Sequence, residues 1–322
     1  MHDLNEAEAL SLLGTVHAEI VQGNVEMGLS RLCDGLNHIQ ARCTDDHWRT
    51  LAKEVIQSHP LMHILRQDPM TRHAYEKPRG YPGDAHLLDL IYHGVDDTFP
   101  IPREVDETAR RVFKSLCRGP HCSSARARRD LLAYYVDRTT ERVVKPRILA
   151  VAAGHLREAR LSMALQRGAI GEWVALDQDV TSLQEIHSAQ YEATGIIQPV
   201  HGRVRDLLKR TLDLGAFDLI YAAGLYDYLS DEIAVGLTEA LFDRLQPGGC
   251  LLVANYSPFG KEHSYMDACM DWWLVRRGEQ QMRSLTRTLP QQAIAAQRVF
   301  AEQEILWFLE VVKAGHPGHK AG

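Results

Sequence analysis

Two features between residues 150 and 180 have the residue types and spacing of a nucleotide-binding site. Residues 151–158 (VAAGHLRE) form a short loop that follows an apolar run and contains one glycine, Gly154. Asp177 ends the next apolar run, 23 positions later, close to the ~20 expected for an acid that binds ribose hydroxyls. A carboxylate suits that task because it only accepts hydrogen bonds and both hydroxyls can donate. The pair predicts a site for an adenosine-containing ligand.

The loop departs from the G-x-G-x-x-G pattern of dinucleotide-binding proteins. Ala152 stands where the first glycine would be, and only Gly154 is glycine. A pyrophosphate needs more bare backbone than this loop offers. S-adenosylmethionine carries no phosphate and tolerates small residues such as Ala152. The loop therefore favours S-adenosylmethionine as cofactor, with S-adenosylhomocysteine as the product.

Further cofactor candidates follow along the chain. Asp206, in residues 202–207 (GRVRDL), follows a predicted third strand, where an acid can accept from the adenine amino group. Residues 217–225 (FDLIYAAGL) predict a fourth strand that enters the same cleft, and residues 245–253 (LQPGGCLLV) predict a turn and a fifth strand. The predicted cofactor-binding residues are Tyr81, Ala152, Gly154, Glu158, Asp177, Gln178, Arg205, Asp206, Leu207, Ala223 and Gly224.

The order of these pieces, from residue 147 to 255, resembles the class I methyltransferase core. A second resemblance covers about residues 60–312. Its segments, RQDP (66–69), KPRGYPGDA (77–85), GHLRE (154–158) and DWWL (271–274), resemble the bacterial PhcB-type methyltransferases. That family is associated with methyl esters of 3-hydroxy fatty acids. The resemblance implies O-methylation of the carboxylate of a fatty acid or related acid, and N- or S-methylation of another small molecule is the alternative.

Residues 77–85 hold two prolines and two glycines, which predicts a stiff, turned loop. Arg79 is a candidate to hold a carboxylate, of the cofactor or of an acid substrate. Tyr81 is a candidate to cover the sulfonium. Asp84 either binds a ligand or caps the following helix.

Other polar residues are candidates for the methyl acceptor. Arg126 and Arg129 share one helix face, as an anion clamp or as partners of surface acids. An amine or hydroxyl acceptor needs a proton acceptor, and a carboxylate needs none. The predicted catalytic residues are Tyr226, His121 and Asp227, with Tyr226 favoured because it comes first after the fourth strand. The predicted substrate-binding residues are Arg79, Asp84, Arg126, Asn255 and Trp272. Trp272 belongs to an aromatic and methionine-rich stretch that core packing explains equally well.

Apolar periodicity predicts the elements that position these residues. Helical spacing indicates a helix pair over residues 10–39 and helices near 46–57, 85–92, 104–117 and 125–139. Strands are predicted at 147–153, 172–177, 217–222 and 250–256, with helices beginning near 157, 181 and 231 between them, and a last strand at 304–312 that adds antiparallel at the sheet edge. The expected fold is α/β, a Rossmann-like class I methyltransferase sheet with helices on both faces, plus an N-terminal helical region. The expected organisation is a helical, substrate-side region (1–140), a cofactor-binding domain (141–314) and a flexible tail (315–322).

The composition of the chain favours some classes of binding partner over others. The chain has 322 residues and a formal net charge of -6, which favours a small-molecule acceptor over nucleic acid. Six scattered cysteines, no leader-like N-terminus and no long apolar run predict a cytoplasmic protein without a transmembrane segment. No metal site is expected, since Cys117, His121 and Cys122 lack a second ligand pair at zinc spacing. The N-terminal helices are expected to cover the cleft or to pair two copies. A cofactor-binding scaffold or sensor and a dinucleotide oxidoreductase are the alternatives of other classes.

Overall fold

The computed structural model describes residues 2–96, 105–188 and 195–315. The chain forms two compact units, here called the helical unit (Met1–Arg126 and Phe259–Trp273) and the sheet unit (Ala127–Pro258 and Leu274–Gly322). The division falls earlier than the predicted boundary at residue 140. The reason is that α8 (Pro120–Arg142) carries Leu132 and Val136 into the core of the sheet unit. All but the first residue of the predicted tail lies outside the described residues.

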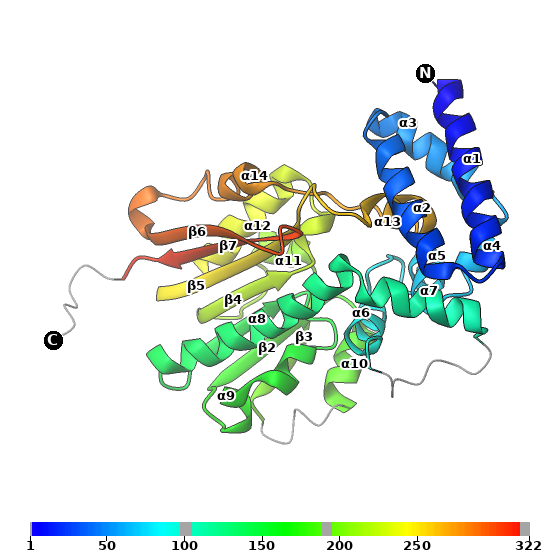
Figure 1. The fold of residues 1–322 in the computed structure, drawn as a ribbon. Coiled ribbons are helices and arrows are strands. Elements are labelled where there is room, and N and C mark those ends of the chain that lie inside the picture. The colour runs from blue at the N-terminus through cyan, green and yellow to red at the C-terminus, as the bar shows by residue number, and fades with distance from the viewer. Residues whose placement is uncertain (1, 97–104, 189–194, 316–322) are drawn as a thin grey trace. The chain divides into compact units, whose positions relative to one another are not determined.

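The helical unit contains the predicted N-terminal helix pair and a series of shorter helices (Figure 1). The predicted helix at 46–57 is an α-helix that continues as a π-helix, and the one at 104–117 begins at Glu107 because Asp106 caps it. Its predicted start, Glu104, is outside the described residues. The elements are α1 (His2–Val21), α2 (Val25–Gln40), α3 (Asp45–Thr50), η1 (Leu51–Ile56), α4 (Leu61–Leu65), α5 (Pro69–Glu76), α6 (Ala85–His93), α7 (Glu107–Arg118), the first turns of α8, and α13 (His263–Cys269).

One late segment of the chain belongs to the helical unit. The side-chain amide of Asn37 donates to the carbonyl oxygen of Lys261 at 2.7 Å, and Gln40 donates to Asp267 at 2.9 Å. Trp48 donates to the same buried carboxylate at 3.2 Å. These bonds attach α13 to α2 and α3, although its residues lie in the segment predicted to belong to the cofactor-binding domain.

Among its described residues, the sheet unit is built on seven strands in the order β3-β2-β1-β4-β5-β7-β6. The first five are parallel, whereas β7 is antiparallel to β5 and β6 is antiparallel to β7. The last predicted strand is therefore antiparallel as expected, but its predicted place at the edge is wrong, because β6 occupies it. The strands are β1 (Arg147–Val151), β2 (Glu172–Asp177), β3 (Ile197–His201), β4 (Phe217–Ala223), β5 (Leu245–Tyr256), β6 (Ile294–Glu302) and β7 (Leu306–Lys313).

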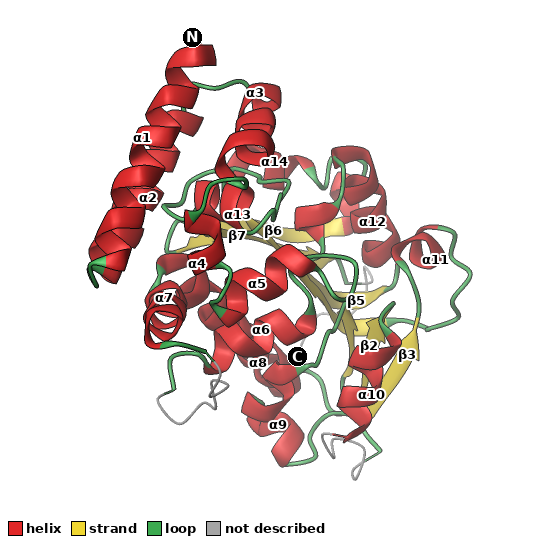
Figure 2. Ribbon diagram, turned by 90° about the vertical axis from the view of Figure 1, so that its right-hand side faces the viewer, coloured by secondary structure: helices red, strands yellow, loops and turns green. Residues whose placement is uncertain are grey.

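Helices cover both faces of this sheet, as predicted (Figure 2). Alternate residues of β1 separate the two cores: Ile148 and Ala150 pack against α8 and its neighbours, and Leu149 and Val151 pack against the opposite layer. In Figure 1, α8 lies across the face turned to the viewer. The same face holds η2 (Arg157–Leu161), α9 (Met163–Gln166) and α10 (Val180–Ser188). The opposite face holds α11 (Val204–Leu208), α12 (Asp231–Asp243) and α14 (Glu279–Ser284). The short helices η4 (Tyr226–Tyr228) and η5 (Gln291–Ala293) lie in connections.

The strand order reverses direction between β1 and β4, which are neighbours in the sheet. In open parallel sheets, ligands bind beyond the carboxyl ends of the strands at such a point. The connections after β1, β2 and β4 meet there, and they hold most of the predicted cofactor residues. Every helix within the described residues is too short or too polar to span a bilayer.

Candidate functional site

The loop after β1 has an unusual backbone. Ala152, Gly154 and Leu156 all have positive φ, at 54°, 54° and 51°. For an alanine and a leucine this conformation costs about 1–2 kcal/mol each, and such strain is concentrated at ligand sites. The N–H of Ala153 donates to the carbonyl oxygen of Leu176 at 3.1 Å, which fastens the loop to β2. Ala152 itself is exposed at the edge of the sheet.

Asp177 joins this loop to the end of β2. One carboxylate oxygen accepts from the N–H of Gly154 at 2.8 Å, and the other accepts from the N–H of Asp179 at 2.8 Å. Burial raises the pKa of Asp177, although these N–H groups and that of Gln178 act in the opposite direction. A carboxylate offers roughly four acceptor positions, so Asp177 retains capacity for a ligand hydroxyl. Gln178, next in the chain, is exposed beside it.

The adenine-side candidates lie on α11. Asp206 accepts from the N–H of Arg203 at 2.9 Å and so caps its own helix, while its side chain keeps 30% exposure. Arg205 points into solvent, with 65% of its side chain exposed. Leu207 is fully buried in the core beneath α12. The Leu207 side chain packs in this core, and the prediction that Leu207 binds the cofactor stays a prediction.

The end of β4 brings Ala223 and Gly224 to the same edge, both partly exposed. Gly224 has φ +95°, and a Cβ there would lie 3.3 Å from Nη1 of Arg128. Arg128 lies on α8 and is only 3% exposed. It was not among the predicted residues. The signal that could have found it is helical spacing, since position 128 falls on the same face of α8 as the buried Leu132 and Tyr135.

Glu158 is buried rather than displayed on the loop. Its carboxylate accepts from the hydroxyl of Tyr221 on β4 at 2.6 Å. Burial raises its pKa, against that hydrogen bond and the charges of Arg128 and Arg129. Glu158 thus connects η2 to β4 and helps to hold the loop after β1 in place.

Tyr226 does not present its hydroxyl to a ligand. The side chain is fully buried, and the hydroxyl pairs with Thr238 of α12 at 3.0 Å. Burial raises the pKa of Tyr226, so its hydroxyl stays protonated. The structure corrects the nomination of Tyr226 as proton acceptor, because the 3-10 turn η4 directs it into the core. Tyr228, two residues later, is 38% exposed.

Asp227 and Asn255 are also held inside the sheet unit. Asp227 accepts from the N–H of Tyr256 at 2.7 Å, and burial raises its pKa to about 6 despite the nearby charges of Arg128, Arg277 and Arg276. Asn255 is fully buried, accepts from Arg277 at 2.7 Å and donates to the carbonyl oxygens of Tyr256 and Val275. Through these contacts the two side chains fix the connection after β4, and the catalytic role of Asp227 and the substrate-binding role of Asn255 stay predictions.

The predicted loop at 77–85 lies in the helical unit. Asp84 caps α6 through the N–H of Leu87 at 2.9 Å and pairs with His73 at 2.8 Å. Burial opposes its ionisation, but the hydrogen bonds from His73 and Leu87 and the charge of Arg79 hold the pKa of Asp84 below its ordinary value. Of the two roles considered for Asp84, the structure supports the helix cap, because the carboxylate is buried. Arg79 and Tyr81 are partly exposed on the same loop.

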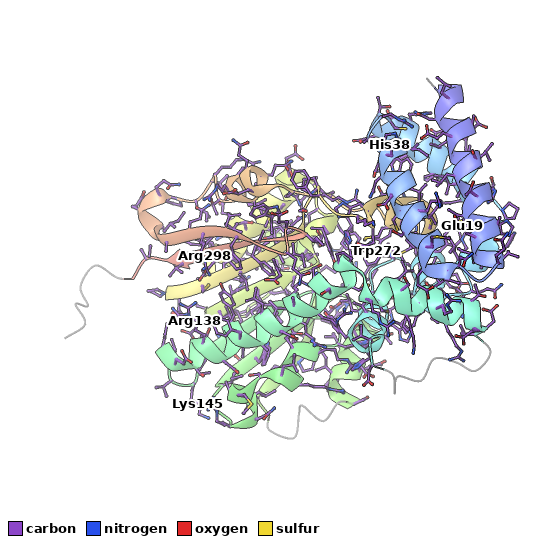
Figure 3. The ribbon with its side chains drawn as sticks, viewed as in Figure 1. Glu19, His38, Arg138, Lys145, Trp272 and Arg298 are labelled. Atoms are coloured by element: carbon purple, nitrogen blue, oxygen red, sulfur yellow. The ribbon has the colours of Figure 1, made fainter. Side chains whose placement is uncertain are left out.

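Three other predicted residues of the helical unit also have defined surroundings. His121 pairs through Nδ1 with the carboxylate of Glu262, and its ring meets that of His263 edge-on at 4.4 Å. Arg126 donates to the carbonyl oxygen of Ile91 at 3.0 Å, at the end of α6. Trp272, labelled in Figure 3, is 7% exposed, and Met266 and Met270 are buried with it, at 5% and 3%. Core packing thus accounts for the methionine-rich stretch.

The comparisons with known proteins concern the fold. No protein-family model matches the chain, and no curated protein matches it. A solved structure described as a possible exported protein from Bordetella parapertussis is similar over 95% of this chain and 97% of its own, with 16% identity and a TM-score of 0.61. The N-methyltransferase NodS from Bradyrhizobium japonicum WM9, in complex with S-adenosyl-L-homocysteine, has 14% identity over 61% of this chain and 89% of its own, with a TM-score of 0.43. Magnesium protoporphyrin IX methyltransferase from Synechocystis PCC 6803 has 12% identity over 60% of this chain and 85% of its own, with a TM-score of 0.44. The Bordetella structure shows that a solved protein has this fold over nearly the full length, and the resemblance to PhcB-type enzymes stays a hypothesis.

Proposed function

We propose that this protein is an S-adenosylmethionine-dependent methyltransferase that acts on a small molecule. One observation carries the proposal: the Asp177 carboxylate accepts from the N–H of Gly154 in a strained loop, at the point where the strand order reverses. A buried carboxylate with acceptor capacity suits the ribose hydroxyls of the cofactor. Ala152 and Gly154 leave backbone uncovered beside it for the methionine part.

The same loop argues against a dinucleotide. A pyrophosphate binds best at the N-terminus of an α-helix, where free N–H groups and the helix dipole favour negative charge. After β1 the chain instead forms the five-residue 3-10 helix η2 and then the four-residue helix α9. Neither supplies a long aligned set of N–H groups. A sulfonium cofactor needs no such anion site.

The first acceptor class is a carboxylate, with a 3-hydroxy fatty acid or a related acid as the leading example. Methyl transfer is an in-line displacement that mainly requires alignment of the acceptor lone pair and exclusion of water. A carboxylate is already ionised and needs no proton acceptor. The partners of Tyr226 and Asp227 support this choice, since the Tyr226 hydroxyl pairs with Thr238 and the Asp227 carboxylate accepts from the N–H of Tyr256.

A second candidate is methylation of an amine, thiol or hydroxyl. The observation that favours it is the pairing of His121 with Glu262. A carboxylate that holds one imidazole nitrogen orients the other nitrogen as a proton acceptor. This pairing makes His121 the candidate base for an acceptor that must lose a proton.

Calorimetric titration of the purified protein with S-adenosylmethionine, S-adenosylhomocysteine and NADH tests the cofactor. We expect micromolar binding of the first two and none of NADH, and the reverse pattern would identify an oxidoreductase. Transfer of a labelled methyl group to matched fatty acids, fatty amines and thiols then sorts the acceptor classes. Binding without transfer to any class would favour the scaffold or sensor.

The helices α1 and α2 are a proposed contact between two copies. Leu4, Leu10 and Met27 are 72%, 45% and 51% exposed on them. Light scattering coupled to size-exclusion chromatography should give a dimer for the wild type and a monomer for a Leu4→Glu/Leu10→Glu variant. A monomeric wild type would reject this contact.

A further inference from the structure

The last turns of α8 and the connection to β1 carry an excess of positive charge. Residues 138–145 (RTTERVVK) contain three basic residues and one acidic residue, Glu141, in a chain whose formal net charge is -6. Arg138, Arg142 and Lys145 are all exposed, and Figure 3 labels Arg138 on α8 and Lys145 just beyond the end of this helix. Within the described residues, no carboxylate lies at ion-pair distance from any of the three. Their charges therefore remain available to an external anion.

Exposed apolar side chains lie among these cations. Val144 is 92% exposed directly before Lys145, and Met163 is 51% exposed at the start of α9. Two bonds join the end of α8 to α9. The N–H of Met163 donates to the carboxylate of Asp137 at 3.0 Å, and Nζ of Lys145 donates to the carbonyl oxygen of Gly168 at 2.5 Å. Val144 and Met163 thus belong to the surface that the cations form.

A cleft of about 670 Å³ opens on the same surface. Lys145 and Arg167 line it together with three glycines, Gly168, Gly171 and Gly195. Arg167 donates to the carbonyl oxygen of Met163 at 3.2 Å, and none of the described residues that line the cleft is acidic. Glycines leave backbone uncovered, so that a phosphate can approach closely, and lysine and arginine both bind phosphate. The cleft therefore suits a phosphate group.

This surface lies at the opposite ends of the strands from the proposed cofactor site. Lys145 comes two positions before β1 and Gly171 directly precedes β2, whereas Gly154 follows β1 and Asp177 ends β2. Strands of five and six residues span roughly 16–20 Å. A partner bound at this surface would not cover the carboxyl ends of the strands.

The combination of cations, exposed apolar side chains and a phosphate-sized cleft indicates the kind of partner. Nucleic acid offers phosphates without a hydrocarbon layer. An anionic lipid surface offers both, because its headgroups attract lysine and arginine and the acyl chains beneath them accept apolar side chains. We propose that this surface docks on an anionic lipid membrane, with a lipid phosphate in the cleft. The docking surface, here called the basic face, consists of Arg138, Arg142, Val144, Lys145, Met163 and Arg167.

Sedimentation with vesicles, in the absence of cofactor, tests the proposal independently of the proposed function. The wild type should bind vesicles of phosphatidylcholine and phosphatidylglycerol in equal parts at least ~10-fold more tightly than phosphatidylcholine alone. Binding should weaken when NaCl rises from about 0.1 to about 1 M, which shortens the Debye length from about 10 to about 3 Å. Arg138→Gln/Arg142→Gln should weaken it roughly 30-fold, because each basic residue near such a surface contributes roughly fivefold. Lys145→Gln/Arg167→Gln should weaken it by at least as much.

Variants of Val144 distinguish insertion of an apolar side chain from attraction between charges alone. Val144→Leu adds one buried CH₂ and should tighten binding roughly fourfold. Val144→Ser should weaken it roughly 10-fold. The matched control is Arg210→Gln/Arg283→Gln, which removes the same net charge from two arginines that are 61% and 50% exposed near α11 and on α14, on the opposite face of the sheet. The control should bind as the wild type does, and thermal unfolding shows that each variant is folded.

Three results would overturn the proposal. The first is a wild type with no preference for the anionic vesicles, and the second is an equal loss of binding in the control. The third is unchanged binding by both Val144 variants, which, with the dependence on charge retained, would indicate nucleic acid or an acidic protein as the partner. Binding of glycerol 3-phosphate without binding of vesicles would also contradict docking, and would make the cleft a site for a soluble phosphate.

Discussion

Arg277 donates from Nε and Nη2 to the same carboxylate oxygen of Asp231, at 3.0 and 2.8 Å. Its Nη1 donates to the carbonyl oxygen of Tyr226 and to Asn255, and Nη2 also donates to Leu229. The fully buried guanidinium thus fastens the connection after β4 to the end of β5. This connection begins at Gly224, so its rigidity bears directly on the proposed cofactor site.

We expect Arg277→Met to lower the free energy of unfolding by about 2–4 kcal/mol, because several buried acceptors lose their donor. Arg277→Lys should recover only part, since an ammonium cannot reproduce the planar fork. Urea denaturation measures both. The control is Arg283→Met, which removes an exposed pair with Glu279 worth at most about 0.5 kcal/mol. Equal effects at the two positions would contradict this account of Arg277.

Tyr226→Phe should cost about 1 kcal/mol of stability, because it removes the hydroxyl bonded to Thr238 and keeps the ring. Methyl transfer should stay within about twofold of the wild type, far from the ~10²–10⁴-fold that loss of a general base causes. Thermal unfolding and initial rates provide the two readouts. Tyr228→Phe, at the exposed position of the same turn, is the matched variant. A large loss of kcat in Tyr226→Phe alone would restore Tyr226 as the proton acceptor.

Asp227 predicts a pH dependence of stability. Its pKa is raised by burial from 3.8 to about 6 in the folded protein, so the folded state holds the proton more tightly than the unfolded state. That stabilisation is fully present below about pH 4 and is lost as the pH rises through 6. The wild type should therefore lose roughly 3 kcal/mol relative to Asp227→Asn between pH 4 and 7. Urea denaturation of both proteins from pH 4 to 7 measures this change. If the stability of the wild type relative to Asp227→Asn stays constant or rises with pH, the hydrogen bond and nearby arginine charges offset the burial of Asp227 in full.

Variants of His121 distinguish a carboxylate acceptor from an acceptor that must lose a proton. With a carboxylate acceptor, His121→Gln and Glu262→Gln should each change kcat by less than about threefold, and the pH profile of kcat should keep its shape. A base would instead contribute about 10²–10⁴-fold. Rates measured from pH 6 to 9 with acid and amine acceptors decide between them. A loss of that size with an acid acceptor would contradict the base-free mechanism.

The sequence predicted the features that depend on local pattern. The strands at 147–153, 172–177 and 217–222 are confirmed because unbroken apolar runs mark buried parallel strands. β6 was missed since its residues are half-exposed and polar at several positions, such as Gln297 and Arg298. The antiparallel β7 was recognised, but its neighbour could not be inferred without β6.

The missed site features depend on contacts between distant residues. Position alone favoured Tyr226, whereas the turn η4 directs that side chain to Thr238. The sequence left Arg126 and Arg129 as an anion clamp or as partners of surface acids, and the buried place of Arg128 between them became visible only from the packing of α8. The assignment of 259–273 to the helical unit follows from bonds such as Gln40 to Asp267, which join residues 227 positions apart. No local pattern encodes such a contact.

The most direct test of the account is calorimetric titration of S-adenosylhomocysteine into the wild type, Asp177→Ala and Glu172→Gln. Glu172 begins the strand that Asp177 ends, so its variant controls for a change on β2 away from the ligand. We predict micromolar affinity for the wild type and Glu172→Gln, and an affinity roughly 10- to 100-fold weaker for Asp177→Ala, which loses a charge-assisted acceptor. Absence of binding by the wild type, or unchanged binding by Asp177→Ala, would contradict the central claim that this edge of the sheet holds S-adenosylmethionine.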